Sequence, residues 1–133
     1  MSAPPQVASP VVELTAITID CRDPAPMVAF YAQAFGGQVS HQDVGGAWIH
    51  LSGGPLVLIR RIEDYTPPTW PSRDVPMQMH FELRVDDLEE AERRLHGLGA
   101  TTCDFQPHRD QGNLVMLDPA GHPFCIGTDA ERR

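Results

Sequence analysis

Apolar and polar residues follow the same order of patterns twice along the chain. Residues 14–21 and residues 79–85 alternate between apolar and polar positions, which is typical of a β-strand with one face toward a core. A helical pattern follows each strand, with Pro24 at its first position in one case and Gly99 after its end in the other. Three short strand patterns come after each helix, at residues 38–43, 47–51, 56–62, 101–105, 114–117 and 124–127. The sequence therefore predicts the order β-α-β-β-β twice.

The two halves align with each other through the starts of their helices, with no gap in the strand before each helix. The turn glycines Gly54 and Gly121 align the last strand pairs in the same way. Acidic residues at both helix starts favour capping of the first turn. The alignment pairs Asp23 with Asp87, Ala16 with His80, Thr18 with Glu82 and Leu58 with Cys125.

Proline marks the segments that connect these patterns. Four of the 13 prolines lie in residues 63–76, a density that neither a helix nor a central strand accepts. The first residues of the chain carry Pro, Ala and Ser without an apolar period, which is typical of a mobile end. We therefore expect an N-terminal tail (1–12), one domain (13–128) made of module 1 (13–62), a linker (63–76) and module 2 (77–128), and a C-terminal tail (129–133).

The amino-acid composition narrows the classes of molecule that the protein can bind. The chain has 133 residues, 10 Lys and Arg and 18 Asp and Glu, which give a formal charge of -8 at pH 7. This charge has the wrong sign for a nucleic acid or an anionic membrane. The longest apolar stretch, residues 55–59, is far shorter than the ~18 residues of a membrane span, and the first residues lack the basic and apolar regions of a signal peptide. We expect a soluble, cytoplasmic protein whose three cysteines are free thiols.

The duplicated pattern resembles the vicinal oxygen chelate superfamily, which includes glyoxalase I, extradiol dioxygenases, some epimerases and bleomycin resistance proteins. The resemblance covers residues 14–128 and lies in the stretches ITIDCRDPAPMVAFYAQAFGG, WIHLSGGPLVLI, HFELRVDDLEEAERRLHGLGAT and LDPAGHPFCI. It implies an α+β fold in which two tandem βαβββ modules form an eight-stranded open cup with the helices outside. It also implies a homodimer, with the cup formed either within one chain or between two.

The resemblance further implies where a metal ion would be held. Metal-dependent members of the superfamily take ligands from four strand positions, which fall here on Ala16, Leu58, His80 and Cys125. Only His80 matches the family pattern, and neither Ala16 nor Leu58 has a donor atom. Because a divalent site needs about three protein donors, we expect no metal cofactor. The alternative is a metal-dependent lyase, isomerase or dioxygenase whose ion is held by His80 with Cys125, Glu82 or Asp20.

Strand alternation selects the residues that would line the cup. His80 and Glu82 lie on the polar face of a strand whose other face is apolar. Trp48 and His50 face the cup if Ile49 faces the helix, whereas the opposite register would make Trp48 part of the core. The candidate ligand-binding residues are Trp48, His50, Arg60, His80, Glu82, Arg84 and Cys125, of which His80 and Glu82 are also candidates for acid-base catalysis.

Several other residues receive structural interpretations. Trp70, between two prolines, is a lid over the cup, a dimer contact or an exposed loop anchor. Cys125 is interpreted as a small buried residue without a basic neighbour in sequence. The DPAG sequence at residues 118–121 is interpreted as a tight turn without a functional role. The remaining histidines, which we expect on the surface or in turns, are His41, His96, His108 and His122.

These observations favour a protein that binds a small molecule in its cup without a metal ion. Its acidic charge favours cationic over anionic ligands. The alternatives are the metal-dependent enzyme described above, a metal-free acid-base catalyst that uses His80 with Glu82, and an interaction module whose cup is packed shut. The sequence contains no GxSxG, P-loop, GxGxxG, HExxH or EF-hand spacing, so hydrolase and nucleotide-binding templates are not supported.

Overall fold

The computed structural model describes residues 10–128 of the chain. The predicted tails at residues 1–12 and 129–133 lie largely or wholly outside the described residues. No helix within residues 10–128 is long and apolar enough to cross a membrane. The elements are β1 (Ala16–Cys21), α1 (Pro24–Phe35), β2 (Gln38–Asp43), β3 (Gly46–His50), β4 (Leu56–Arg61), β5 (Glu82–Arg84), α2 (Leu88–Gly97), β6 (Thr101–Thr102), a short 3-10 helix (Arg109–Gln111), β7 (Asn113–Leu117) and β8 (Pro123–Gly127).

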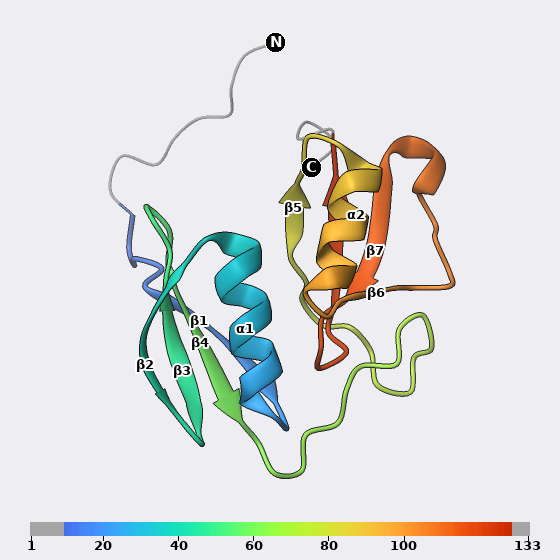
Figure 1. Cartoon of the computed structure of the whole chain (residues 1–133). Helices are drawn as coiled ribbons and strands as arrows, with labels where there is room; N and C mark the ends of the chain where they lie inside the picture. Colours follow the sequence, from blue (N-terminus) through green and yellow to red (C-terminus); the bar gives the residue numbers. More distant parts are fainter. Residues whose placement is uncertain (1–9, 129–133) are drawn as a thin grey trace.

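The strands form two separate four-stranded sheets, with the orders β1-β4-β3-β2 and β5-β8-β7-β6 (Figure 1). In each sheet the first strand of the module pairs in parallel with the last, so that Thr18 lies opposite Leu58 and Glu82 lies opposite Cys125. This is the correspondence that the alignment of the two sequence halves predicts. The predicted fold class, α+β with two tandem βαβββ modules, is confirmed. The eight strands that were expected to form one open cup lie in two separate open sheets within the chain, and α1 lies between the modules rather than outside them.

The two helices begin differently, although both start after an aspartate. Asp87 caps α2, because its side chain accepts a hydrogen bond of 3.0 Å from the backbone N–H of Glu90. Asp23 occupies the N-cap position of α1, but its side chain makes no capping hydrogen bond. The prolines at the first and third helical positions, Pro24 and Pro26, have no N–H to donate. The predicted acidic cap is therefore present at α2 only.

Strand β5 is shorter than the predicted strand at residues 79–85, for a reason that lies in its neighbour β8. The backbone N–H of Cys125 still donates to the carbonyl oxygen of Phe81 at 2.9 Å, one residue before β5. Continued by two residues, the register would place His80 opposite Pro123. Because proline has no backbone N–H, the hydrogen-bonded ladder ends there. His80 therefore lies in the segment just before the strand.

Strand β6 is also shorter than the predicted 101–105, because a side chain takes over its place in the ladder. After the backbone N–H of Cys103 donates to the carbonyl of Val115 at 3.1 Å, strand pairing stops. The amide of Gln106 then binds both backbone groups of Val115, with distances of 2.8 and 2.9 Å. The side-chain amide of Gln106 thus forms the hydrogen bonds with the backbone of β7 that a longer edge strand would otherwise form.

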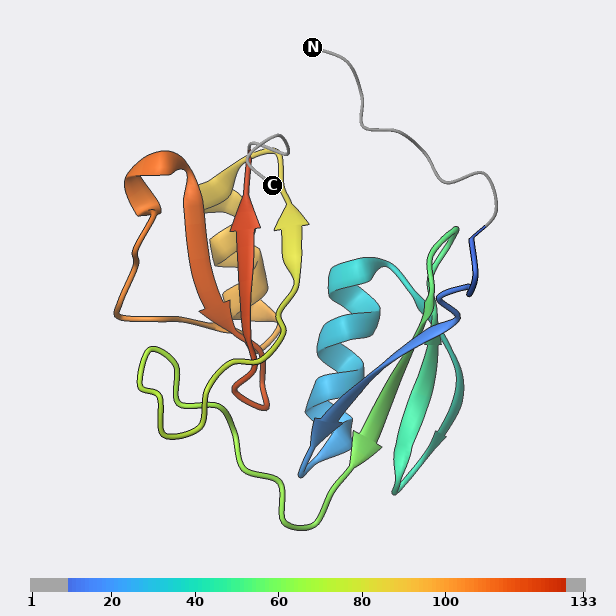
Figure 2. The same ribbon diagram turned by 180° about the vertical axis from the view of Figure 1, so that it is seen from behind.

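Helix α1 lies between the first sheet and the second module, as Figures 1 and 2 show from opposite sides. It covers the apolar face of the first sheet, where Ile49 is completely buried. On the side of the second module, the Phe30 ring lies 5.9 Å from that of Phe124, and the Tyr31 ring lies 6.1 Å from that of Phe81. The buried apolar residues of both modules consequently form one continuous core.

A buried hydrogen bond joins α1 to the turn between β7 and β8. The hydroxyl group of Tyr31 donates to the carboxylate of Asp118 at 2.6 Å, and Asp118 is only 3% exposed. The same carboxylate accepts hydrogen bonds from the backbone N–H groups of Ala120 and His122. Burial and the nearby carboxylate raise the pKa of Tyr31 well above its usual value. Asp118, which sequence analysis assigned to a simple turn, therefore connects the two modules.

We predict that Tyr31→Phe lowers the free energy of unfolding by about 1–3 kcal/mol, because a buried carboxylate loses its donor. Denaturation by urea, followed by circular dichroism, measures the change. Tyr65→Phe is the matched control, since the Tyr65 hydroxyl donates to the carbonyl of Ala120 in a less buried site; it should cost about 1 kcal/mol or less. Equal effects of the two changes would contradict a special role for the Tyr31 bond.

The start of β3 requires glycine at position 46. Gly46 has a φ of 145°, and a Cβ atom built there would lie 1.7 Å from the carbonyl oxygen of Ile59. We predict that Gly46→Ala costs at least about 3 kcal/mol of stability, because two backbones would have to separate. Gly97→Ala is the control: it has open space and should be neutral or stabilising by up to about 1 kcal/mol. Thermal unfolding of both variants tests this, and a stable Gly46→Ala variant would refute it.

Candidate functional site

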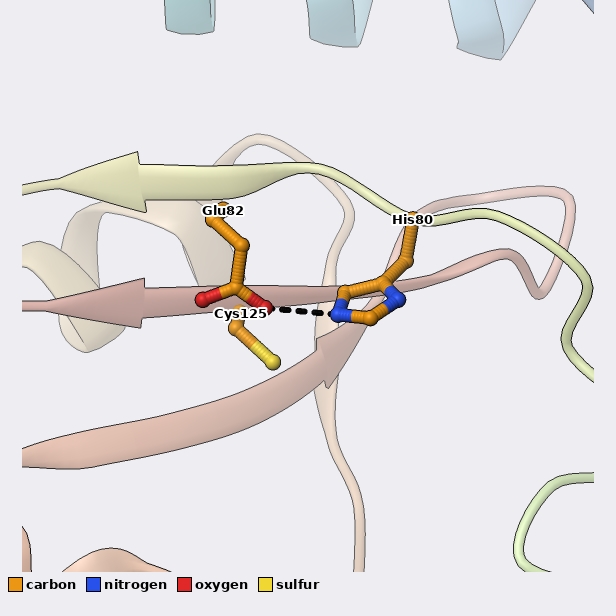
Figure 3. A group of neighbouring side chains, drawn as sticks. All are labelled: His80, Glu82 and Cys125. Carbon is orange, nitrogen blue, oxygen red and sulfur yellow. Dashed lines mark hydrogen bonds and ion pairs between the residues drawn. The ribbon is translucent and has the colours of Figure 1, made fainter. Parts of the chain in front are cut away.

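Three polar side chains meet on the face of the second sheet that points away from α2. Glu82 and Cys125 are direct cross-strand neighbours on β5 and β8, and His80 lies two residues before Glu82. His80 Nε2 lies 2.6 Å from the carboxylate oxygen Oε2 of Glu82 (Figure 3). One nitrogen, one oxygen and one sulfur atom from these residues lie within 4.8 Å of one another. We call this group the donor cluster.

The donor cluster is buried on one side and open on the other. Cys125 is only 7% exposed, whereas the side chains of His80 and Glu82 are 31% and 39% exposed. Burial raises the pKa of the Cys125 thiol to about 11; the Glu82 carboxylate acts in the same direction, and a hydrogen bond with Asn113 acts against it. At neutral pH the thiol is therefore protonated, and it is not an activated nucleophile.

The first module has no counterpart of the donor cluster, although its strands have the same register. The corresponding positions are Ala16, Thr18 and Leu58, and Thr18 lies opposite Leu58 as Glu82 lies opposite Cys125. Of the three, only Thr18 has a polar side-chain atom. The two modules therefore share a backbone arrangement but differ in the chemistry of the face that it presents.

The open face of the first sheet carries an aromatic residue instead. Trp48 and His50 on β3 lie opposite to the buried Ile49, and Trp48 is 51% exposed. The His41 ring lies 5.6 Å from that of Trp48, and His50 Nε2 lies 2.6 Å from the hydroxyl oxygen of Ser40. This face therefore offers the flat ring of Trp48, bordered by polar groups.

Both arginines among the candidate residues are paired with carboxylates. Arg60 donates to Asp20 at 3.0 and 3.4 Å across strands β4 and β1, and Arg84 donates to Asp86 at 2.9 Å. These ion pairs are exposed and contribute little to stability. They matter for function because each guanidinium charge is compensated by its own carboxylate.

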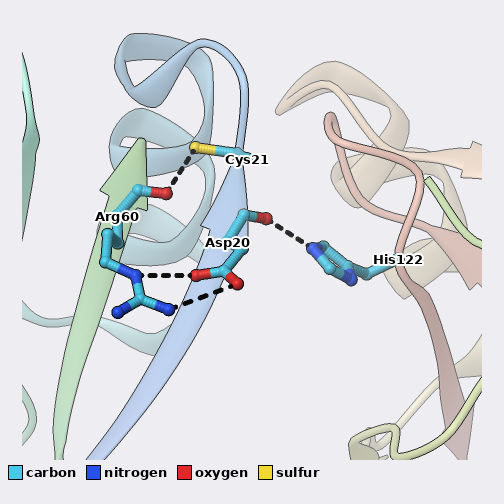
Figure 4. A network of polar contacts seen from close by, with 4 residues as sticks. All are labelled: Asp20, Cys21, Arg60 and His122. Carbon is cyan, nitrogen blue, oxygen red and sulfur yellow. Dashed lines mark hydrogen bonds and ion pairs between the residues drawn. The ribbon is translucent and has the colours of Figure 1, made fainter. Parts of the chain in front are cut away.

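A second network links the end of β1 to the second module (Figure 4). His122 Nε2 donates to the backbone carbonyl of Asp20 at 2.6 Å, and the Tyr65 hydroxyl lies 3.2 Å from the same nitrogen. Tyr65 also donates to the carbonyl of Ala120 at 2.7 Å. The expectation that His122 is a turn residue holds, but the sequence did not show that it contacts the first module, because its partner lies 102 residues away.

Trp70 lies against the second module rather than over an open face. Its ring lies 5.6 Å from that of Phe105, which is itself 52% exposed. The linker around Trp70 is held by hydrogen bonds between Thr69 and Val75, including one of 2.7 Å between their backbones. Nothing in this geometry brings Trp70 to the donor cluster.

The candidate residues fall into two groups within one chain. Trp48, His50 and Arg60 belong to the first sheet, and His80, Glu82, Arg84 and Cys125 belong to the second. In residues 10–128, no hydrogen bond, ion pair or aromatic ring contact joins the two groups. A site that uses both groups therefore needs more than the contacts of one chain.

A separate cavity of about 620 Å³ opens where β1 and β4 end and α1 begins. Arg22 and Arg61 line it together with Asp23 and Asp43. It contains none of the candidate residues and none of the donor cluster. Because Pro24 and its neighbour Pro26 remove two N–H groups of the first helical turn, the helix start offers few donors to an anion.

A glyoxalase-like domain model matches residues 16–127 of the chain. The chain therefore belongs to the glyoxalase-like domain family. A search of curated proteins gave no match.

Solved structures with the same fold come from several bacteria. A glyoxalase-related enzyme from Fulvimarina pelagi has a TM-score of 0.63 at 19% identity and covers 88% of both chains. An enzyme of the glyoxalase/bleomycin resistance protein/dioxygenase family from Burkholderia phytofirmans PsJN has a TM-score of 0.61 at 21% identity, covering 88% of this chain and 98% of the other. A variant of the fosfomycin resistance protein FosX from Listeria monocytogenes, bound to Mn(II) and 1S,2S-dihydroxypropylphosphonic acid, has a TM-score of 0.66 at 15% identity, covering 94% and 96%.

The Mn(II) in that FosX structure raises the question of whether this chain fits such an ion. Manganese prefers oxygen and nitrogen ligands in octahedral geometry. Here the first module supplies no donor at Ala16 or Leu58, and the second module supplies a thiol at Cys125. The residues present do not fit a Mn(II)-type ion, and we derive no chemistry through one. Because three donors nevertheless converge, the expectation of a metal-free protein is not confirmed.

We predict that native Cys125 resists alkylation. Its burial and a pKa of about 11 should slow its reaction with iodoacetamide at pH 7.5 at least roughly tenfold relative to the same residue in denaturant. Peptide mapping by mass spectrometry separates Cys125 from Cys21 and Cys103. Equal rates in native and denatured protein would show that the thiol is accessible and ionised, and would contradict the described geometry.

Proposed function

We propose that the protein binds a small organic molecule in a cup that two copies of the chain complete, without a Mn(II)-type ion. The observation that carries this proposal is the separation of the candidate residues. An aromatic surface lies on one open sheet, and an acidic, hydrogen-bonding cluster lies on another, with α1 between the sheets. Two copies bring the first sheet of one chain to the second sheet of its partner.

Two open sheet edges support a dimer of this kind. Within the described residues β1 pairs only with β4, and β5 pairs only with β8. Unpaired strand edges favour pairing with another chain. Met79, just before β5, is 90% exposed, and an apolar side chain of this size gains stability when a partner covers it. In our proposal the β1 edge of one copy meets the β5 edge of the other.

The charges of the two faces favour a ligand with a cationic group. Arg60 and Arg84 are each compensated by an aspartate, as described above. Glu82 pairs with no arginine in the described residues, since its side-chain neighbours are the imidazole of His80 and the thiol of Cys125. An ammonium group can therefore bind at Glu82, while a flat or ring-shaped part stacks on the half-exposed Trp48. The net charge of -8 acts in the same direction.

A second candidate function is a lyase, isomerase or dioxygenase reaction with a rebuilt metal site around His80. The convergence of His80, Glu82 and Cys125 within 4.8 Å favours it. A metal-free version, in which the hydrogen-bonded pair of His80 and Glu82 moves a proton, uses the same residues.

We predict a dimer in solution, with a mass of twice the 14.7 kDa of the chain. Native mass spectrometry of protein treated with a chelator measures the mass, and it also detects any retained small molecule. Met79→Glu should shift the equilibrium toward the monomer, because it places a charge at the proposed contact. Val44→Glu is the control, since Val44 is 84% exposed in the turn between β2 and β3, away from both edges. A wild-type monomer at micromolar concentration would refute the dimer.

We predict that benzylammonium binds more tightly than benzoate, which has a ring of the same size and the opposite charge. The fluorescence of Trp48, measured in a Trp70→Phe background with chelator present, reports both titrations. Glu82→Gln should remove the preference, because it removes the carboxylate that no arginine compensates. Glu89→Gln on the exposed side of α2 is the charge-matched control and should keep it. Equal affinities, or tighter binding of benzoate, would contradict the proposed ligand class.

A further inference from the structure

The donor cluster holds three different kinds of metal ligand in one module. His80 offers an imidazole nitrogen, Glu82 a carboxylate oxygen and Cys125 a sulfur atom, all within 4.8 Å of one another (Figure 3). The parallel register of β5 and β8 places Glu82 beside Cys125, so two of the three donors stand on hydrogen-bonded strands. The arrangement needs neither the first module nor a second copy of the chain.

The donor atoms lie within 4.8 Å of one another, so small shifts would bring them to the spacing around a four-coordinate ion. Tetrahedral zinc has bonds of about 2.0–2.3 Å, so its ligand atoms lie roughly 3.3–3.7 Å apart. His80 Nε2 and Glu82 Oε2 are 2.6 Å apart in a hydrogen bond. An ion would replace the proton of this bond, and the two atoms would have to move roughly 0.7–1.1 Å further apart, which is less than a change of rotamer provides. The Cys125 thiol would lose its proton on binding.

The chemistry of the donors selects the class of ion. A thiolate is a soft ligand that favours zinc-type ions over magnesium or manganese, and the Irving–Williams order places Zn(II) above Mn(II) at any such site. Three protein ligands leave a fourth position of a tetrahedral ion free. Because His80 and Glu82 are partly exposed and Cys125 is buried, that position faces the open side of the sheet.

We propose that His80, Glu82 and Cys125 form a three-ligand site that binds a zinc-type ion in preference to Mn(II) and Mg(II). This site differs from one built on four strands of both modules, since Ala16 and Leu58 contribute nothing to it. The inference does not rest on the small-molecule proposal. It is tested with metal alone, whereas the dimer and benzylammonium tests are made in the presence of a chelator, so each proposal fails independently.

The test is a titration of the full chain, stripped of metal and kept reduced with a phosphine, with Co(II) as a coloured substitute for zinc. Wild-type protein should bind one equivalent, with a near-ultraviolet thiolate-to-cobalt band and the strong visible bands of tetrahedral cobalt. Zn(II) should displace the cobalt at an at least roughly 100-fold lower concentration than Mn(II). Cys125→Ser should abolish the thiolate band, and Cys103→Ser, which removes a thiol outside the cluster, should leave it unchanged.

Two further variants separate ligation from folding. His80→Ala and Glu82→Gln keep the thiol, so the band should persist while cobalt affinity falls at least roughly tenfold. Circular dichroism confirms that each variant is folded before the titration. The proposal is overturned by a wild-type spectrum of octahedral cobalt only, by a thiolate band that persists in Cys125→Ser, or by Mn(II) that displaces cobalt as readily as Zn(II). It is also overturned if folded His80→Ala and Glu82→Gln bind cobalt as tightly as wild type.

Discussion

The packing of α1 between the two modules is the constraint on which the rest of the structure depends. One side of the helix covers the first sheet, and the other side contacts the second module through Phe30, Tyr31 and the buried carboxylate of Asp118. Because the helix fills the space between the sheets, the strands of one chain form two sheets rather than one. The outer edges of β1 and β5 therefore stay unpaired within residues 10–128.

The two modules share a backbone arrangement but place different side chains on it. Each places one residue of its first strand beside one residue of its last strand in the same register. In the first module these residues are Thr18 and Leu58, and the neighbouring strand adds Trp48. In the second they are Glu82 and Cys125, with His80 beside them. The first module thus presents an aromatic side chain, and the second presents an imidazole, a carboxylate and a thiol.

Much of the fold could be predicted from the sequence, because alternation and helical periodicity are local signals. The succession of strands and helices along the chain and the correspondence of the two halves follow from such signals. The ends of β5 and β6 could not be predicted in this way. They depend on partners elsewhere in the chain, namely Pro123, which has no N–H for the ladder, and Gln106, whose amide binds the backbone of β7.

The candidate site was predictable residue by residue, but its geometry was not. Alternation pointed to His80 and Glu82, and the resemblance to the vicinal oxygen chelate superfamily pointed to Cys125. That these residues converge follows only from the parallel pairing of β5 with β8. The links from Tyr31 to Asp118 and from His122 to Asp20 span 87 and 102 residues, and no local pattern marks them. A polar residue in a turn next to an apolar strand is the one signal that directs attention to Asp118.

The central claim is that α1 holds the modules apart and that the first sheet of one copy meets the second sheet of another. Crosslinking between chains tests it most directly. One chain carries Thr18→Cys and the other carries Met79→Cys, both in a Cys103→Ser background, and the mixture is treated with a short bismaleimide. The account predicts crosslinked dimers from the mixture at a much higher rate than from Thr18→Cys mixed with Glu89→Cys on α2. Equal yields from the two mixtures would contradict it.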